Sequence, residues 1–200
     1  MGPKNKIVSF FVLSIMSYCF WFFLTEDNHN DYLKLLVFSK TKGFRHASIE
    51  DGQKMFQSLA ERNGFEVIFS EESEVFNERT LSDINVIVFL NTTGDILDDN
   101  QQLELQRYIQ AGGGFVGIHS ATDTEYKWSY YNQLVGAYFD SHPETAEATL
   151  KILNRDHIST QHLPQNWIRI DEWYNFKKIN PEFFFSFFVF RSPSFPPFQP

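Results

Sequence analysis

The chain has 200 residues, of which 42% are hydrophobic, and this is enough for one globular domain with a buried core. Its 25 acidic side chains outnumber 17 basic ones, and the resulting net charge of -8 argues against nucleic acid or another polyanion as partner. The one cysteine, Cys19, lies near the N-terminus, so the part expected to fold has no disulfide, thiolate metal site or cysteine nucleophile.

The N-terminus carries a long apolar segment. Two lysines lie within residues 1–6, residues 7–24 are almost entirely apolar, and residues 25–31 form a polar linker. A basic start followed by an apolar run is typical of a secretory signal, so we expect a secreted or periplasmic protein. The run is also long enough for a membrane anchor, and both outcomes for residues 1–24 stay open. Any contact with a membrane is expected through this segment only.

The next residues predict a strand and a helix. A strand is expected over 32–39, and a helix over 48–63. Ser48 and Asp51 have the spacing of a capping pair, and Gly64 is placed to end the helix.

The same alternation continues along the chain. Strands are expected over 65–69, 84–90 and 115–119, and a helix from Asp98 to about residue 109, before the glycines 112–114. Strands that alternate with helices of this length indicate right-handed βαβ units. The fold class is therefore α/β, a three-layer sandwich with a largely parallel sheet and helices on both faces.

Beyond Asp123 the pattern is weaker. We expect a short helix over 127–135 and strands over 148–153 and 167–174. Residues 183–200 are a phenylalanine run followed by a proline-rich tail, and the prolines oppose regular structure. We therefore expect a folded domain over 32–182 and a tail over 183–200 outside the fold.

Polar loops follow three of the predicted strands, over 41–48, 91–97 and 119–123. Because the carboxyl ends of parallel strands meet at one edge of a sheet, their side chains are expected to converge there, where open α/β sheets bind ligands. The converging residues are His46, Thr92, Thr93, Asp95, His119, Ser120 and Asp123.

An ordered set of short motifs resembles the ThuA-like, or trehalose-utilisation, family over about residues 33–180. The motifs are KGFRHA (42–47), NTTG (91–94), GGGFVGIHS (112–120), Trp128, YNQLVGAYF (131–139), SHP (141–143) and DEWY (171–174). The resemblance implies a flavodoxin-like fold of the class I glutamine amidotransferase-like superfamily and a role in carbohydrate metabolism. It also implies further strands after the DEWY motif, so the domain is expected to be incomplete at its C-terminus and the chain poorly soluble or inactive.

Glutaminases of that superfamily carry a cysteine on the turn after a strand, and His119 occupies that place here. An imidazole does not replace a thiolate as acyl carrier, so glutaminase activity is not expected. Ser120 lacks the flanking glycines of a serine-hydrolase turn, because Ile118 and Thr122 stand in their places.

His119 is instead a candidate general acid or base, assisted by Asp123 or Glu172. The alternative is a buried histidine that satisfies the backbone of its turn. The residues expected to bind substrate are His46, Thr92, Thr93, Gly94, Ser120, His142 and Trp173.

No cofactor is expected, and a divalent metal is left open. His46, His119 and His142 with Asp123 have the chemistry of an open zinc or iron site, but their spacing is dispersed. The loop at 92–94 lacks a phosphate-binding glycine spacing, and Asp95 would repel an anion, which disfavours nucleotides and flavins.

These observations predict a carbohydrate-related enzyme that performs acid–base chemistry on a sugar or keto-sugar, with a small carbohydrate as partner. The alternatives are a non-catalytic sugar-binding or interaction module and an inactive fragment. The sequence predicts no oligomeric state.

Overall fold

The computed structural model describes residues 32–180 and the backbone of residues 187–191. The predicted leader and linker lie outside these residues, so their role stays a prediction. No helix within the described part is both long and apolar enough to cross a membrane. The elements are β1 (Lys34–Phe38), α2 (Ser48–Asn63), β2 (Glu66–Ser70), η1 (Ser73–Val75), α3 (Glu78–Leu81), β3 (Val86–Leu90), α4 (Asp99–Gln110), β4 (Gly114–Ile118), η2 (His119–Asp123), α5 (Ser129–Val135), β5 (Tyr138–Ser141), β6 (Ala146–Ile152), β7 (Asn166–Asp171), β8 (Asn175–Lys177) and β9 (Phe187–Arg191).

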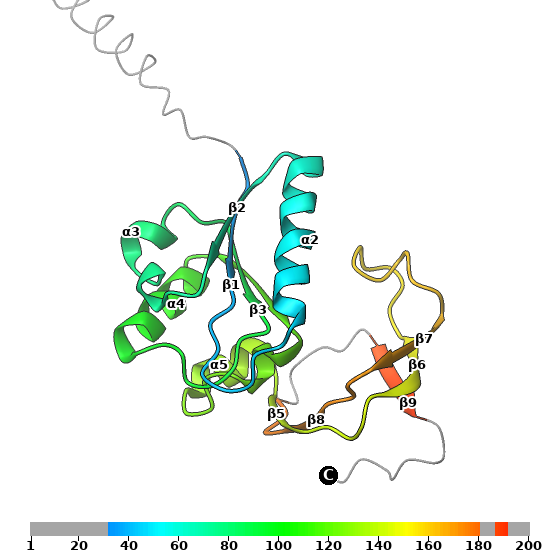
Figure 1. The fold of residues 1–200 in the computed structure, drawn as a ribbon. Helices are drawn as coiled ribbons and strands as arrows, with labels where there is room; N and C mark the ends of the chain where they lie inside the picture. The colour runs from blue at the N-terminus through cyan, green and yellow to red at the C-terminus, as the bar shows by residue number, and fades with distance from the viewer. Residues whose placement is uncertain (1–31, 181–186, 192–200) are drawn as a thin grey trace, which may run out of the picture. The chain divides into compact units, whose positions relative to one another are not determined.

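Four parallel strands form the central sheet in the order β2-β1-β3-β4 (Figure 1). The chain passes from β1 to β2 on one side and then crosses to β3 on the other side of β1. The strand order therefore reverses between β1 and β3, and the carboxyl ends of these strands are the place where such sheets bind ligands. The α/β fold with a parallel sheet is confirmed.

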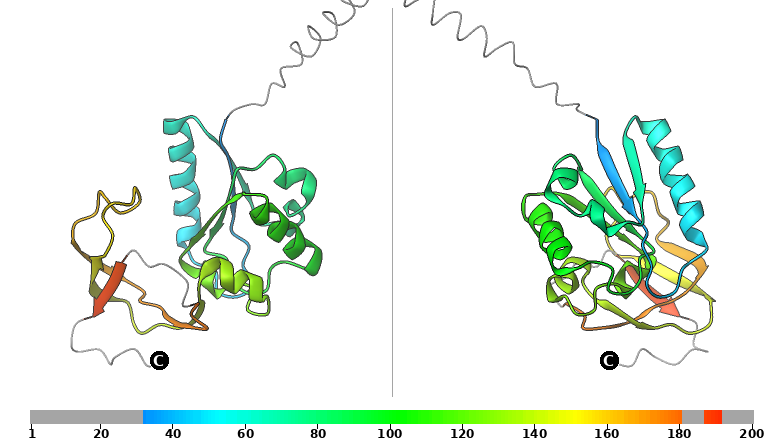
Figure 2. Two further views of the ribbon diagram at one scale, coloured as in Figure 1. Left: turned by 180° about the vertical axis from the view of Figure 1, so that it is seen from behind. Right: turned by 60° about the vertical axis from the view of Figure 1, so that its left-hand side comes forward.

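Helices cover both faces of this sheet, as predicted (Figures 1 and 2). Leu36 and Phe38 of β1 belong to the core cluster that also includes residues of α3, α4 and α5. Leu35 and Val37 point to the opposite face, where Phe56 of α2 joins them. The alternation follows from the period of two residues in a strand, and it places β1 at the centre of the core.

The two longer helices start differently. Asp98 caps α4. Its side chain accepts from the Gln101 backbone N–H, and the Gln101 side chain accepts from the Asp98 backbone N–H. The capping pair predicted for α2 is wrong, because Ala47 is the N-cap and no side chain caps it. Ser48 Oγ instead accepts from Asn91 Nδ2 at 2.8 Å, which ties the start of α2 to the loop after β3. Gly64 ends α2 in the left-handed conformation, as predicted.

The chain beyond α5 forms two small antiparallel sheets that the sequence pattern did not predict as such. β5 pairs with β8, and β6 pairs with β7. The strand predicted over 167–174 is divided, because β7 ends at Asp171 and β8 begins at Asn175. The link between them holds the acidic-aromatic segment.

The prediction that the tail lies wholly outside the fold is wrong for the backbone of Phe187–Arg191. This segment forms β9 and pairs antiparallel with β6, with Ala148 opposite Arg191 and Ile152 opposite Phe187. The free edge of β6 offers unpaired backbone groups, and phenylalanine and valine favour extended structure. Residues 181–186 and 192–200 lie outside the described residues.

Candidate functional site

Buried hydrogen bonds hold the loops at the carboxyl edge of the sheet. Thr93 Oγ1 accepts from the Gly43 N–H and donates to the Phe44 carbonyl, both at 3.1 Å, which positions the loop that carries His46. Thr92 Oγ1 lies 2.9 Å from Thr124 Oγ1.

Thr92 and Thr93 are fully buried. The Gly94 N–H donates to the Asp123 carbonyl at 2.8 Å. These three predicted substrate-binding residues therefore position loops, and their polar groups are bonded within the protein.

His119 lies directly after β4, on the first residue of the turn. Its φ of 52° falls in the left-handed region, where a residue with a Cβ is strained. The turn presents the imidazole at the sheet edge with its side chain 25% exposed. Ser120, the next residue, is buried, and its Oγ lies 3.4 Å from Nδ1 of His46.

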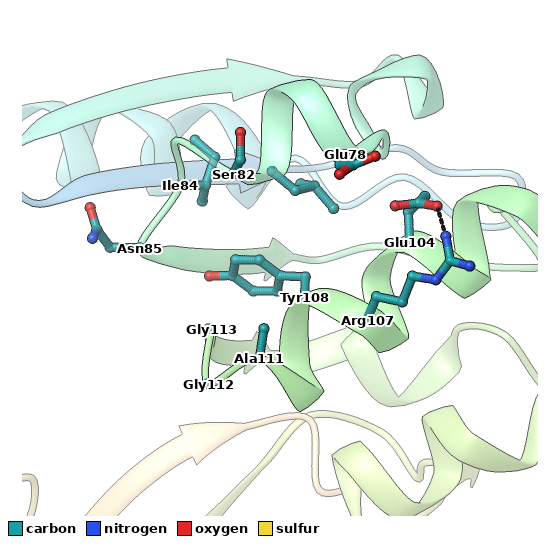
Figure 3. A pocket seen from close by; sticks show the side chains of 11 residues that line it. Glu78, Ser82, Ile84, Asn85, Glu104, Arg107, Tyr108, Ala111, Gly112 and Gly113 are labelled. Atoms are coloured by element: carbon teal, nitrogen blue, oxygen red, sulfur yellow. Dashed lines mark hydrogen bonds and ion pairs between the residues drawn. The ribbon is translucent and has the colours of Figure 1, made fainter.

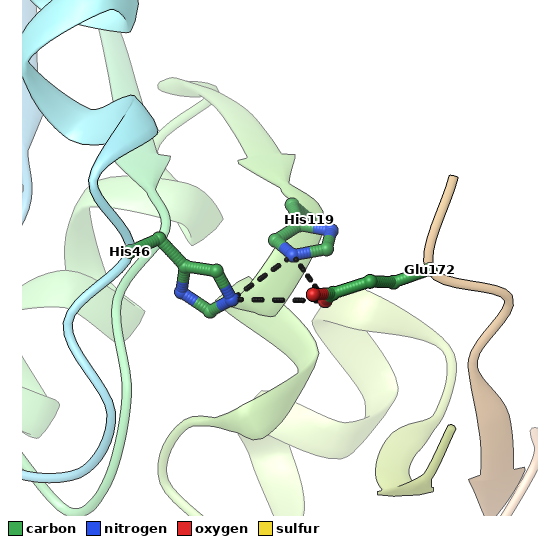
Figure 4. A group of neighbouring side chains, drawn as sticks. All are labelled: His46, His119 and Glu172. Carbon is green, nitrogen blue, oxygen red and sulfur yellow. Dashed lines mark hydrogen bonds and ion pairs between the residues drawn. The ribbon is translucent and has the colours of Figure 1, made fainter. Parts of the chain in front are cut away.

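Three side chains from distant parts of the chain point toward one another: His46 from the loop after β1, His119 after β4, and Glu172 after β7 (Figure 4). The Nε2 atoms of the two histidines are 3.1 Å apart. Glu172 Oε2 lies 3.3 Å from the His119 nitrogen and 3.9 Å from the His46 nitrogen. We call these three side chains the central triad.

Tyr174 and His142 adjoin the triad. The Tyr174 hydroxyl is 2.9 Å from His119 Nε2, and the two rings lie 4.7 Å apart. His142 Nε2 is 3.8 Å from Glu172 Oε2, while its Nδ1 lies 2.8 Å from the Pro143 carbonyl oxygen. The His142 ring stacks on Tyr174 at 5.7 Å. Four residues that were predicted for the site and lie in four separate segments, His46, His119, His142 and Glu172, thus share one site with Tyr174.

Two predicted site residues make their hydrogen bonds outside the central triad. Trp173 packs with Ala148 and Leu150, and its indole N–H donates to the Ala146 carbonyl, so it belongs to the core beside β6. The Asp123 carboxylate accepts from the Tyr126 hydroxyl and is not in the central triad. Glu172 is therefore the carboxylate that the structure brings to the histidines.

Burial and charge set the protonation of this cluster. Burial, followed by the neighbouring His119, lowers the pKa of His46 below its ordinary value, although the Glu172 charge opposes the shift. Burial, followed by the charge of Glu172, raises the pKa of Tyr174. These shifts favour a neutral His46 imidazole and a protonated Tyr174 phenol next to Glu172, a set of groups suited to proton exchange or to cation binding.

Residues 34–194 match the family model described as ThuA, trehalose utilisation. This chain belongs to the ThuA family. It is 22% identical to a ThuA-like protein from Bacteroides uniformis, with a TM-score of 0.64 over 74% of this chain and 62% of that one. A ThuA-like protein from Parabacteroides merdae is 19% identical, with a TM-score of 0.59 over 72% of this chain and 63% of that one.

These likenesses concern the fold, and the chain spans about three fifths of each solved relative. No curated protein matches it.

Two pockets of this ThuA-family chain differ in their chemistry. A pocket of about 230 Å³ lies beside the His119 turn and is also lined by Thr122 and Leu134. Another, of about 600 Å³, lies by α3, α4 and the start of β4 (Figure 3). There the Arg107 guanidinium pairs with Glu104 at 2.7 Å, and the Tyr108 hydroxyl donates to the Gly114 carbonyl. Because these polar groups are paired with one another, the candidate chemistry lies at the His119 turn.

Sequence reasoning missed Glu125, and from the aromatic pair 173–174 it chose Trp173 and not Tyr174 as the site residue. Glu125 is buried, and its Oε1 accepts from the backbone N–H groups of Ile96 and Leu97 at 2.7 and 2.8 Å, so it holds the loop after β3. Tyr174 could have been found from the two-residue period of extended chain, which puts it on the same side as Glu172 and turns Trp173 away. Nothing in the local pattern around Glu125 indicates its burial.

Proposed function

We propose that this ThuA-family chain is a carbohydrate enzyme that transfers protons on a sugar or keto-sugar at the central triad. The observation that carries the proposal is the convergence of three imidazoles on the Glu172 carboxylate, with the Tyr174 hydroxyl against His119, beside the point where the strand order reverses. The family's connection with trehalose utilisation supports a glycoside as the substrate class.

Each group has a role in this proposal. A proton leaves a sugar carbon next to a ketone for a basic group of the triad, and an acidic group returns a proton to the ketone oxygen, so that the product is an enediol and no atom is lost. His119 lies between His46, Glu172 and Tyr174 and is the group placed to exchange that proton. His46 and His142 are placed to donate to or accept from hydroxyls at either side of Glu172.

A second candidate is a sugar-binding module without turnover. The aromatic stack of His142, Tyr174 and Phe139, with ring centroids 5.7 and 4.4 Å apart, favours it, because such faces bind sugars without reacting.

The test compares turnover with binding. The full chain is incubated in D2O with keto-glycosides and with their unoxidised parents, and the exchange of carbon-bound hydrogen for deuterium is followed by mass spectrometry. The variant Glu172→Gln keeps the shape of the side chain and removes its charge, and Glu144→Gln is the matched control because Glu144 is exposed.

Turnover by the wild type and the control, reduced on the order of a hundredfold in Glu172→Gln, would support the enzyme. Retention on a glycan column without turnover would favour the binding module. A chain that neither turns over nor retains any glycoside would overturn both.

A further inference from the structure

The Glu172 carboxylate has an unusual environment. Within the described residues, its Oε2 atom is buried and accepts no hydrogen bond. The three imidazole Nε2 atoms around it, at 3.3, 3.8 and 3.9 Å, lie at ion-pair distance without hydrogen-bond geometry. A buried anionic oxygen without a donor is costly, so a proton or a cation beside Glu172 Oε2 would stabilise the site.

The hydrogen bond of His142 indicates its tautomer, and the tautomer determines which atom faces Glu172. Its Nδ1 lies 2.8 Å from the Pro143 carbonyl, and a carbonyl only accepts, so Nδ1 carries a proton. In the neutral ring Nε2 then has a free lone pair, and this atom faces Glu172 Oε2. Two acceptors that face each other across 3.8 Å repel unless a cation or proton lies between them.

His46 fits the same pattern. Its Nδ1 lies 3.4 Å from Ser120 Oγ, which can accept the Nδ1 proton and leave the Nε2 lone pair directed at the triad. Hydrogen bonds of this kind, made by the ring nitrogen remote from the ion, are the usual support of metal-binding histidines.

The spacing of the donor atoms matches the coordination shell of a small cation. A zinc ion with bonds of about 2.0–2.1 Å in tetrahedral geometry keeps its ligand atoms about 3.3 Å apart. The three edges of the central triad are 3.1, 3.3 and 3.9 Å. Two imidazoles and one carboxylate are ligands of borderline transition metals, whereas calcium and magnesium prefer all-oxygen shells.

We propose that His46 Nε2, His119 Nε2 and Glu172 Oε2 bind one divalent transition-metal ion of the zinc type. The fourth tetrahedral position would be taken either by His142, which lies next to Glu172, or by a ligand from outside the protein. With the ion bound, His119 Nε2 would be a ligand and would no longer exchange the proton. The ion would serve as a Lewis acid for a sugar carbonyl or hydroxyl, and the Tyr174 hydroxyl, next to His119, would remain as a proton donor. Metal binding rests on the geometry alone, and only its part in turnover rests on the proposed function.

The test measures binding of Co²⁺ and Zn²⁺ to the full chain, purified without a histidine tag. Cobalt is followed by its visible absorption, zinc by displacement of cobalt, and stoichiometry by elemental analysis. The variants are His46→Ala and Glu172→Gln, and the matched controls are His162→Ala and Glu144→Gln, both at exposed positions.

We expect one ion per wild-type chain and per control chain, and affinity at least about a hundredfold weaker in His46→Ala and Glu172→Gln. Because a variant can fail to fold, thermal unfolding is recorded with and without Zn²⁺. The ion should raise the midpoint of the wild type and of the controls and leave that of Glu172→Gln unchanged.

A wild-type chain that binds less than about a tenth of an equivalent, or triad variants that bind as tightly as the controls, would overturn the metal site. Turnover that persists at full rate in the chelated, metal-free chain would leave the proposed enzyme standing and remove the ion from its chemistry. A bound ion without any turnover would contradict the enzyme and leave the metal site in place.

Discussion

The region from β1 to α5 and the region from β5 to β8 contribute to the site in different ways. In the first, a parallel sheet buried on both faces carries His46 and His119 on the loops at its carboxyl edge. Thr93 holds the loop of His46, and Glu125 holds the neighbouring loop after β3. In the second, two small antiparallel sheets carry Glu172 and Tyr174 on a link between strands, and exposed apolar side chains such as Ile168 and Ile170 remain on β7.

The difference indicates that the first region fixes the two imidazoles and the second brings the carboxylate to them. The stability of the molecule should therefore depend on loop-holding residues of the first region. Turnover and metal binding should depend on both.

The largest effect is expected for Glu125→Ala. It leaves the backbone N–H groups of Ile96 and Leu97 and the amide of Gln102 without their buried acceptor, at a cost of about 3 to 5 kcal/mol. Urea unfolding measures it. Glu144→Ala, which removes an exposed carboxylate of the second region, should change stability by no more than about 0.5 kcal/mol. If the two variants lose the same free energy of unfolding, stability does not depend mainly on the first region.

Two substitutions of His119 separate its part in turnover from the backbone strain at its position. His119→Ala and His119→Gly should both lower turnover on the order of a hundredfold, since each removes the imidazole. Glycine adopts the left-handed φ of this position without penalty, so His119→Gly should be more stable than His119→Ala by about 1 kcal/mol. Steady-state kinetics and urea unfolding test both statements. Full turnover in either variant would show that the imidazole takes no part in the reaction.

The two helix starts give a smaller effect. Asp98→Ala should cost about 1 kcal/mol because it removes the cap of α4. Asp51→Ala should cost less than about 0.5 kcal/mol, since Asp51 does not cap α2 and pairs only with the exposed Lys54. Thermal unfolding of the two variants is compared, and a larger loss in Asp51→Ala would restore the capping pair that the sequence predicted.

The smallest effect concerns pH. Burial raises the pKa of Glu125 above its ordinary value of 4.5, so the folded state holds this proton to a higher pH than the unfolded state. The stabilisation is present below pH 4.5 and is lost as pH rises through the raised pKa. Glu125→Gln should therefore lose less stability than the wild type as pH rises from 4.5. If the stability of both chains changes with pH in the same way, the titration belongs to other groups.

The sequence alone determined the parallel-sheet region. Short apolar strands, helices with a three-to-four-residue period and polar loops after the strands are local signals, and they predicted β1, α2, β3, α4 and β4 with the loops of His46 and His119 at one edge. This succeeds because parallel strands bury both faces, so nearly every residue of β1 and β3 must be apolar.

Only the tertiary structure decided which carboxylate meets the histidines. Asp123 lies in the same short turn as His119, yet its carboxylate accepts from Tyr126. Glu172 comes from the link between β7 and β8, whose position depends on antiparallel pairing between residues far apart in the chain. The same holds for β9, whose backbone adds to the free edge of β6. Such pairings join residues far apart in the chain, and a local pattern of side chains does not specify which distant edge a strand will meet.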